Sequence, residues 1–582
     1  MKIITFIFLF LGFISSSSAQ KAHIVRLLPE KELLAYFPSS SIAFVSKDTI
    51  ETSRRVSAVI AHLHAKGLLT AAVDSVVLQH DTLKISLFLG PSLKRAVINT
   101  KNISVLVLRK TGLKTSFNNI NKFSYKEFSK MEFKLVDYYQ TVGYPFATVF
   151  LDSISLENRT VVGTLKLEKG PFIVFDSIQI EGKTKTKKKF LYHFTRIRVN
   201  DPFDQTLVDN AYKLLKQLPY LRVNGYPKVS FVNGKASVIF PIDDRKANQV
   251  DGVAGFAPNQ QTNSTQPTKI IVTGEFNLNL KNMAGRGKNL KIEWRRLKPE
   301  SQQLDLEYFH PNLFGSPINV IPVFGLLKQD TTFQTVTSTL KTNFNLGANV
   351  SMGFYVGSKQ SRLLSTKRYA TYLKPPFLDY NLNTYGVDYE WNNLDDYFYP
   401  KRGNRFFVDA NVGVKSIKSN SRLPERLYDN VRKSNTQFYF KSELSHYFKT
   451  GKRSTLLANV RTGRVFNDNL LVTNDLFLIG GLKTMRGFNE NFFYAEYYST
   501  GTLEFRQFTD ERSYVMVFAE QSFMKYRLGP DSVDDWPIGM GLGLSLSTNT
   551  GIFNFVYSLG QAQTQKLQFN QAKVHFGYIT RF

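Results

Sequence analysis

Cysteine is absent from this chain of 582 residues. A chain without cysteine has no disulfide bonds to stabilise it, and because position 20 is Gln it has no cysteine there to carry a lipid. Long hydrophobic runs are also missing beyond the N-terminal segment, where no stretch offers the ~18 consecutive apolar residues of a membrane-spanning helix. These absences exclude a disulfide-stabilised fold, a lipoprotein and a helical membrane protein.

The motifs that carry enzyme chemistry are missing too. The eight histidines show no metal-ligand spacing, and the chain has no H-E-x-x-H, G-x-S-x-G or G-x-x-x-x-G-K-[ST] motif. Asp395 and Asp396 lie at the end of a strand pattern, which favours a turn over a catalytic pair. We therefore predict that the protein is not an enzyme and that it has no catalytic residue, metal or cofactor.

The N-terminal segment has the pattern of an export signal. Lys2 precedes an apolar run over residues 3–14, and Ser17 and Ala19 supply small residues before a cleavage point. This pattern predicts a signal peptide over residues 1–19. The formal charge of +29 favours solubility, with Lys and Arg at loop ends, and attraction to anionic outer-membrane lipid is the alternative. No nucleic-acid partner is expected for an exported chain.

Three similar segments follow at a constant interval. Helical patterns end at Gly67, Gly143 and Pro219, and both intervals are 76 residues. Each helical pattern is followed by two short alternating runs, as expected for two strands. We therefore expect three β-α-α-β-β units. Their predicted ranges are 20–91, 92–171 and 172–245.

Alternating strand patterns dominate the rest of the chain. They begin near residue 249 and are separated by clusters of Gly, Asn, Asp and Pro. Residues 249–582 comprise 334 positions. A spanning strand needs ~9–11 residues and strand number is even, so sixteen strands fit, and fourteen with longer loops is the alternative. We predict α+β repeats followed by an all-β, 16-stranded antiparallel transmembrane barrel over residues 246–582.

The segment GGLKTMRGF is the most distinctive motif of the chain. Gly480, Gly481 and Gly487 permit positive φ angles and close chain approach. Arg486 offers a planar fork of donors that needs an acidic or carbonyl partner. With Phe488, the segment resembles the R-G-[FY] loop of the BamA/TamA-type outer-membrane assembly family, whose sixth extracellular loop folds into the barrel lumen.

Other parts of the chain are similar to the same family. The three N-terminal units resemble POTRA domains. The barrel segments that resemble family motifs are 282–287 (N-L-F-G-x-G), 395–403 (D-x-x-x-P-x-x-G), 517–522 (V-F-A-D-A-G), 539–557 and 577–582. Two positions depart from the pattern: Val556 stands where an acid is expected, and Thr580 where an apolar residue is usual.

The resemblance implies a partner for Arg486 inside the lumen. The family places acids at the positions of Glu520 and Val556, so here only Glu520 can serve. We predict an Arg486–Glu520 contact that contributes ~1–3 kcal/mol when partly buried. A surface arginine without a fixed partner is the alternative.

The resemblance also implies a weak seam between the first and last strands, expected at residues 249–257 and 573–582. Glycines weaken a strand interior, and a poorly paired seam exposes N–H and C=O groups to which a client strand can add. The predicted seam residues are Gly252, Gly255, Gly577 and Phe582. An ordinary closed barrel with glycine at points of curvature is the alternative.

The implied function is assembly or translocation of other proteins at the outer membrane, with the repeats in the periplasm. Three repeats favour a TamA-like factor. The expected partners are unfolded outer-membrane or surface proteins, a periplasmic or inner-membrane protein bound through the POTRA-like repeats, and outer-membrane lipid. A two-partner secretion-type translocator is an alternative, disfavoured because no long helix precedes the first repeat. A passive porin or receptor barrel is the alternative of a different class.

Overall fold

The computed structural model forms two compact units, Met1–Val174 with Pro202–Gln205 and Phe175–Asp201 with Thr206–Phe582. The residues that it describes are 23–91, 95–100, 102–113, 117–120, 125–157, 160–258, 270–298, 300–366, 369, 372, 375–429, 431–528, 531–548 and 550–582. The expected signal peptide at residues 1–19 lies outside these described residues.

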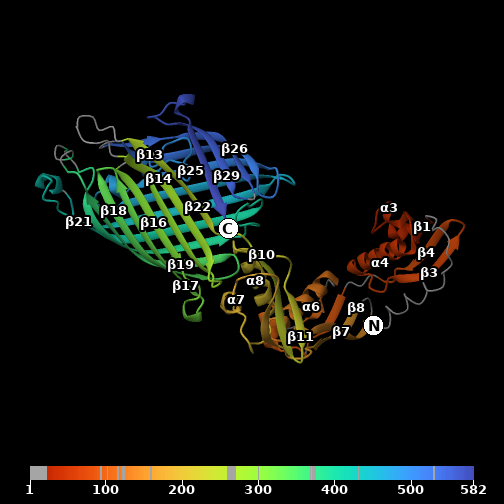
Figure 1. Ribbon diagram of the computed structural model, residues 1–582. Helices are drawn as coiled ribbons and strands as arrows, with labels where there is room; N and C mark the ends of the chain where they lie inside the picture. The colour runs from red at the N-terminus through yellow and green to blue at the C-terminus, as the bar shows by residue number, and fades with distance from the viewer. Residues whose placement is uncertain are drawn as a thin grey trace. The chain divides into compact units, whose positions relative to one another are not determined.

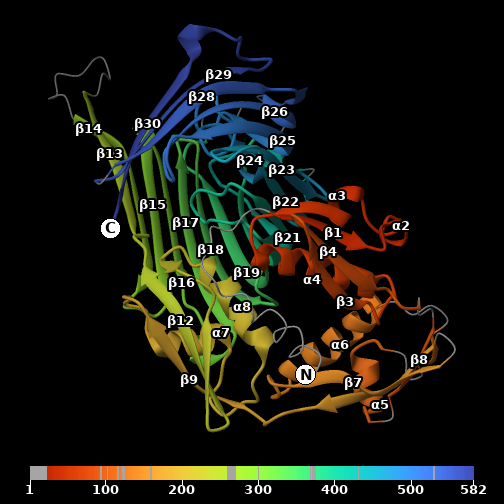
Figure 2. The ribbon, with the colours of Figure 1, turned by 90° about the vertical axis from the view of Figure 1, so that its right-hand side faces the viewer.

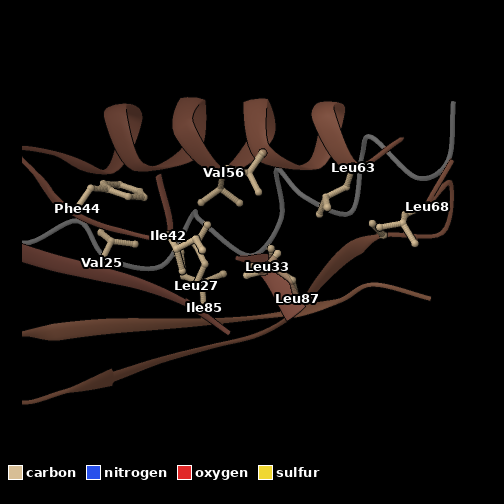
Figure 3. Packing of buried hydrophobic residues seen from close by; sticks show 12 residues of the cluster. Val25, Leu27, Leu33, Ile42, Phe44, Val56, Leu63, Leu68, Ile85 and Leu87 are labelled. Carbon is tan, nitrogen blue, oxygen red and sulfur yellow. The ribbon is translucent and has the colours of Figure 1, made fainter. Parts of the chain in front are cut away.

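The first α+β region is a four-stranded sheet covered by helix α4 (Thr49–Ala65). The sheet order is β2-β1-β4-β3, and β1 and β4 are parallel. Its other elements are β1 (His23–Leu28), α2 (Glu30–Leu33), α3 (Ser39–Ile42), β2 (Ala43–Ser46), β3 (Ala72–Gln79) and β4 (Thr82–Phe88). Helix α4 begins after Asp48, whose carboxylate accepts a hydrogen bond from the Glu51 N–H at 2.6 Å. Val56 and Leu63 of the helix pack toward the sheet (Figure 3).

The second α+β region repeats this arrangement with the sheet order β6-β5-β8-β7. Its elements are β5 (Arg95–Asn99), α5 (Val105–Lys110), β6 (Phe117–Ile120), α6 (Tyr125–Gln140), β7 (Thr148–Glu157) and β8 (Thr160–Glu168). Strands β5 and β8 are parallel, as β1 and β4 are. The glycines after α4 and α6, Gly67 and Gly143, both have φ 94°. Only a residue without a side chain adopts this left-handed helix end without strain, so these glycines mark equivalent positions in the two repeats.

The third α+β region belongs to the same compact unit as the barrel. Its elements are β9 (Val174–Glu181), α7 (Lys188–Thr195), α8 (Gln205–Lys216), β10 (Leu221–Val223), β11 (Lys228–Val232) and β12 (Lys235–Asp244). Strand β12 pairs with β9, β10 and β11. Helix α7 contacts the hairpin turn at residues 284–287, where the Lys187 N–H donates to the Gly285 carbonyl at 2.8 Å. A Cβ at Gly287 would lie 2.2 Å from the Phe190 ring, so glycine is required for this contact.

The C-terminal region is a closed antiparallel barrel (Figure 1). Its wall has sixteen strands, which confirms the predicted strand number. The sixteen strands are β13 (Gln249–Pro258), β14 (Ile270–Met283), β15 (Lys288–Lys298), β16 (Ser301–Phe309), β17 (Ile318–Gln329), β18 (Phe333–Asn345), β19 (Val350–Leu363), β20 (Asp379–Asn392), β21 (Gly403–Lys418), β22 (Ser434–Lys449), β23 (Ser454–Asn467), β25 (Phe493–Phe508), β26 (Tyr514–Leu528), β28 (Ile538–Ser547), β29 (Ile552–Gln561) and β30 (Lys573–Arg581). Two short segments, β24 (Phe477–Ile479) and β27 (Asp531–Asp535), add to β25 and β26 without interrupting the closure.

Alternate residues along the strands face the outside and the inside of the barrel. On β22, Phe438 and Phe440 are exposed on the outer face, whereas Gln437 is fully buried. An apolar outer band with a polar interior is the pattern of a barrel surrounded by lipid. Among the described residues, no helix is long and apolar enough to cross a membrane.

Candidate functional site

The candidate site consists of the lumen loop, defined as residues 480–492, and of the seam between β13 and β30. Three glycines of the loop have positive φ angles: Gly480 at 125°, Gly481 at 93° and Gly487 at 91°. A Cβ at Gly487 would lie 2.4 Å from the carbonyl oxygen of Leu559 on β29. The loop therefore approaches the barrel wall so closely that only glycine fits.

Arg486 lies inside the barrel and is bound by two carboxylates. Its Nε donates to Glu520 Oε1 at 2.8 Å, and its backbone N–H donates to Glu520 Oε2 at 2.8 Å. Its Nη1 donates to Glu504 Oε2 at 2.6 Å. Its Cζ lies 3.4 Å from the centroid of the Phe518 ring. All three charged residues are buried, and removing one partner of such a buried pair costs about 3–5 kcal/mol.

Glu504 corrects the expectation that Glu520 alone can serve as the partner of Arg486. Glu504 lies on β25, next to β26, and also binds Arg506, whose Nε donates to Glu504 Oε1 at 2.7 Å. Thr500, Thr502 and Glu504 are all buried at alternate positions of β25. That alternation was visible in the sequence and could have identified Glu504 as an inward-facing acid.

Phe488 holds the tip of the loop by apolar contact. It is fully buried, and its ring centroid lies 4.9 Å from that of Phe493 in an edge-to-face arrangement. The same cluster contains Met485, Met524 and Tyr526. The motif thus binds one wall of the barrel by charge and by apolar burial together.

The lumen loop also reaches the opposite side of the seam. Lys483 Nζ lies 2.8 Å from Glu293 Oε1, and Glu490 Oε2 lies 3.4 Å from Arg295 Nη1, with both partners on β15. The Lys483 side chain is 52% exposed, so solvent screens its ion pair. The Glu490–Arg295 pair is less exposed but longer than the ion pairs of Arg486. The loop is therefore bound by short, buried ion pairs to β25 and β26, and by one exposed and one longer pair to β15.

A second anchor of the same connection was not foreseen from the sequence. Asp475, which follows β23 and precedes the lumen loop, forms a salt bridge with Lys415 on β21, and both side chains are fully buried. The Val472 N–H donates to Asp475 Oδ2 at 2.9 Å. The sequence around Asp475 gives no signal for this pairing, because its partner lies 60 positions away.

At the seam β13 and β30 lie side by side (Figure 2). In the described strands, β13 and β30 pair at three positions, Gln249 with Arg581, Val250 with Thr580, and Asp251 with Ile579. On its other side, β13 pairs with β14 at ten positions. Among the described residues, the seam pairing therefore stops after a fraction of the strand length, and the facing backbone edges of both strands have no further ladder partner there.

The predicted seam residues lie on these edges. Gly252 and Gly255 pair with β14, and Gly577 pairs with β29; none of the three belongs to the described β13–β30 ladder. Phe582 lies at the paired end, where its N–H donates to the Asn248 carbonyl at 3.1 Å. At Gly577 an added Cβ would meet no described atom within 4 Å, so this glycine leaves open space beside the seam.

The chemistry of the site is that of charge pairing and backbone hydrogen bonding. Within the described ranges, no group of three or more His, Asp or Glu side chains could hold a metal ion. The arrangement can fix a loop in a lumen and present strand edges.

A closed 16-stranded barrel with α+β units before it and an Arg-Gly-Phe loop inside it defines a class of outer-membrane β-barrel proteins. The Omp85 superfamily domain matches residues 282–582, and the chain belongs to this superfamily. The family resemblance noted in the sequence is thereby confirmed. Members of the superfamily are assembly or transport factors. The protein resides in the outer membrane, with its N-terminal region in the periplasm.

Solved structures share the fold at low sequence identity. CdiB from Acinetobacter baumannii is 12% identical, covers 84% of this chain and 90% of its own, and has a TM-score of 0.53. CdiB from Escherichia coli is 11% identical, covers 90% of this chain and 98% of its own, and also has a TM-score of 0.53. BamA from Haemophilus ducreyi lacking POTRA domains 1–3 is 15% identical, covers 84% of this chain and 100% of its own, and has a TM-score of 0.41. No curated protein sequence matches the chain.

Proposed function

We propose that this protein is a TamA-like assembly factor that inserts or translocates unfolded outer-membrane or surface proteins through its seam. The observation that carries the proposal is the three-position ladder between β13 and β30. Continuing its register would place Val253 opposite Gly577 and Ala257 opposite Lys573, and neither pair belongs to the described ladder. The seam is therefore the shortest ladder described between neighbouring strands of the barrel wall.

Backbone edges at this joint favour strand addition. An unsatisfied backbone polar group in the hydrocarbon region costs several kcal/mol. An incoming strand that pairs with β13 or β30 removes this cost, and its alternate side chains face lipid and lumen in turn. The exposed Val574 and Phe576 of β30 offer the apolar outer face that such a strand would extend.

The periplasmic region supplies a second edge of this kind. Strand β3 is one of the two edge strands of the first sheet, and Val76, Val77 and Leu78 on it are all more than half exposed. We propose that this edge docks clients or a periplasmic or inner-membrane partner by strand addition. We propose that the chain consists of a signal peptide at residues 1–19, three POTRA-like repeats at 20–91, 92–171 and 172–245, and the barrel at 246–582.

A disulfide across the seam tests the proposal, because the chain has no cysteine of its own. Val250→Cys and Thr580→Cys place the two thiols on paired residues. A control pair, Val412→Cys with Phe438→Cys, joins β21 to β22. Cells that contain only the oxidised seam variant should lose outer-membrane proteins and recover with reductant, whereas the control pair should have no effect. Full activity with the seam locked would refute the proposal.

A passive porin or receptor predicts a different result. Depletion would then change conductance or uptake without changing the levels of other outer-membrane proteins. Measuring both quantities in the same depleted cells separates the two functions.

A further inference from the structure

The turn between β20 and β21, residues 393–402, is shaped by its own acids. Asp395 Oδ1 accepts hydrogen bonds from the N–H groups of Lys401 at 2.9 Å and Arg402 at 3.1 Å. Asp396 Oδ1 accepts from the N–H groups of Phe398 at 2.7 Å and Tyr399 at 2.8 Å. These bonds fix the backbone and determine how the two aromatic side chains are presented.

The same turn lies against strand ends on a distant part of the barrel. Tyr399 is buried in a cluster with Phe508 at the end of β25 and Ile552 at the start of β29. Lys401 Nζ lies 4.3 Å from the centroid of the Phe508 ring, and the Lys401 carbonyl accepts from Thr455 Oγ1 on β23 at 2.9 Å. A turn from β20 and β21 therefore crosses to the strands that lead to the seam.

Residues on both sides of the seam bind this turn. Arg245, just before β13, donates from Nη1 and Nη2 to the two carboxylate oxygens of Asp396, at 2.9 and 3.2 Å. Arg581, at the end of β30, donates from Nη1 to the Tyr399 hydroxyl at 2.9 Å. The Phe398 ring lies near both guanidinium groups, 5.0 Å from Arg245 Cζ and 4.0 Å from Arg581 Cζ. One aromatic ring thus attracts a cation from each edge of the seam.

We propose that residues 393–402 form a clasp that keeps the seam closed at its periplasmic end. The inference rests on the proposed function, in which the seam opens for clients. All three described seam pairs lie at residues 249–251 and 579–581, beside the clasp. The only described pairing between β13 and β30 is therefore found where a third segment holds both strands.

The clasp also connects the seam to the third α+β region. Arg245 directly follows β12, and its N–H donates to the Tyr220 carbonyl at 2.9 Å. A displacement of this region therefore pulls on the Arg245–Asp396 pair. We infer that the third α+β region regulates the seam through Arg245, so that engagement of the periplasmic region loosens the clasp.

The test measures the closed fraction of the seam itself. In the Val250→Cys, Thr580→Cys protein, the crosslinked fraction at equilibrium in a glutathione buffer reports the effective concentration of the two thiols. Phe398→Ala should lower that effective concentration about fivefold, and Tyr399→Phe by a smaller factor, since each removes a cation–π contact or a hydrogen bond. Phe314→Ala, on another hairpin turn and 99% exposed, is the matched control.

The outcomes separate the clasp from the proposed function. The clasp would be overturned if Phe398→Ala and Phe314→Ala gave the same effective thiol concentration. Both proteins must retain the heat-modifiable mobility of a folded barrel for this comparison. Arg245→Ala is measured in the same way. If Phe398→Ala lowers the effective thiol concentration and Arg245→Ala does not, the clasp is supported, but its regulation by the third α+β region is overturned. Crosslinking is read without reference to client assembly, so a locked seam with full activity would overturn the proposed function alone.

Discussion

Arg486 Nη1 lies 2.6 Å from Glu504 Oε2. This ion pair joins the lumen loop, which contains Arg486, to strand β25, which contains Glu504. Together with Glu520 on the neighbouring strand, Glu504 places two buried carboxylates around one guanidinium. The loop is thus fixed to two adjacent strands by a side chain whose planar fork matches both acids.

Loss of Arg486 should release the lumen loop. Arg486→Ala leaves the buried Glu520 without its close cation, whereas Glu504 keeps Arg506. Removing one partner of such a buried pair costs about 3–5 kcal/mol, so the loop should become sensitive to proteinase K in intact cells. Arg486→Lys should restore only part of the protease resistance, because an ammonium group lacks the planar set of donors that binds both carboxylates at once. Cleavage equal to that of the parent protein would contradict the contact.

The contacts of the loop with β15 should contribute far less. Lys483→Ala removes a half-exposed ion pair, which is worth less than about 1 kcal/mol. Its cleavage should match that of the parent, and raising the salt concentration should have little further effect. A loop released by Lys483→Ala as fully as by Arg486→Ala would contradict the inferred strong and weak sides.

Substitution by alanine should destabilise the loop at one glycine and have no effect at another. Gly487→Ala forces a Cβ against a backbone oxygen at φ 91°, which should cost about 1–3 kcal/mol and expose the loop to protease. Gly577→Ala enters open space among the described atoms and should leave folding and cleavage unchanged. Equal behaviour of the two variants would contradict the close approach of the loop to β29.

The buried pair of Lys415 and Asp475 should stabilise the barrel only as a pair. Lys415→Met leaves a buried carboxylate without its cation and should lower stability by about 3–5 kcal/mol. Adding Asp475→Asn should recover much of the loss, since no charge then remains buried. The temperature at which the heat-modifiable band shifts measures both variants, and a double variant less stable than Lys415→Met would contradict the pairing.

The clasp should weaken in acid. Burial opposes ionisation of Asp396, but hydrogen bonds from Arg245 and from the Tyr399 N–H outweigh it and hold the pKa of Asp396 below its usual range. A carboxylate whose pKa is lower in the folded state than in the unfolded state stabilises the fold at neutral pH. This stabilisation is lost as the pH falls through the folded-state pKa. The difference in unfolding temperature between the parent and Arg245→Ala should therefore be largest at pH 7 and narrow below about pH 4. A difference independent of pH would contradict an ionised Asp396.

The sequence predicted the fold class because its signals are local. Alternation identified the strands, the length of residues 249–582 with an even strand number favoured sixteen over fourteen, and the left-handed glycines after α4 and α6 lie at the 76-residue interval of the repeat. The loop motif could be recognised from the sequence because the loop packs closely against the barrel wall. Such close packing admits only glycine at positions such as Gly487, next to Arg486.

Contacts between distant strands could not be predicted in the same way. Lys415 and Asp475, or Arg245 and Asp396, meet only because the barrel closes and the turns cross its end. The sequence predicts Asp395 and Asp396 as turn residues, and both carboxylates accept hydrogen bonds from backbone N–H groups of the turn. Nothing in the local pattern indicated that this turn reaches the seam.

Capture of a client strand at the seam tests the central claim most directly. A photo-crosslinking residue is placed at Val574 or Phe576 of β30, and as a control at Phe440 of β22, which is also exposed but pairs with a neighbour on both sides. The account predicts that a stalled outer-membrane client crosslinks at positions 574 and 576 and not at position 440. Equal crosslinking at all three positions, or none at β30 while the client is still assembled, would contradict it.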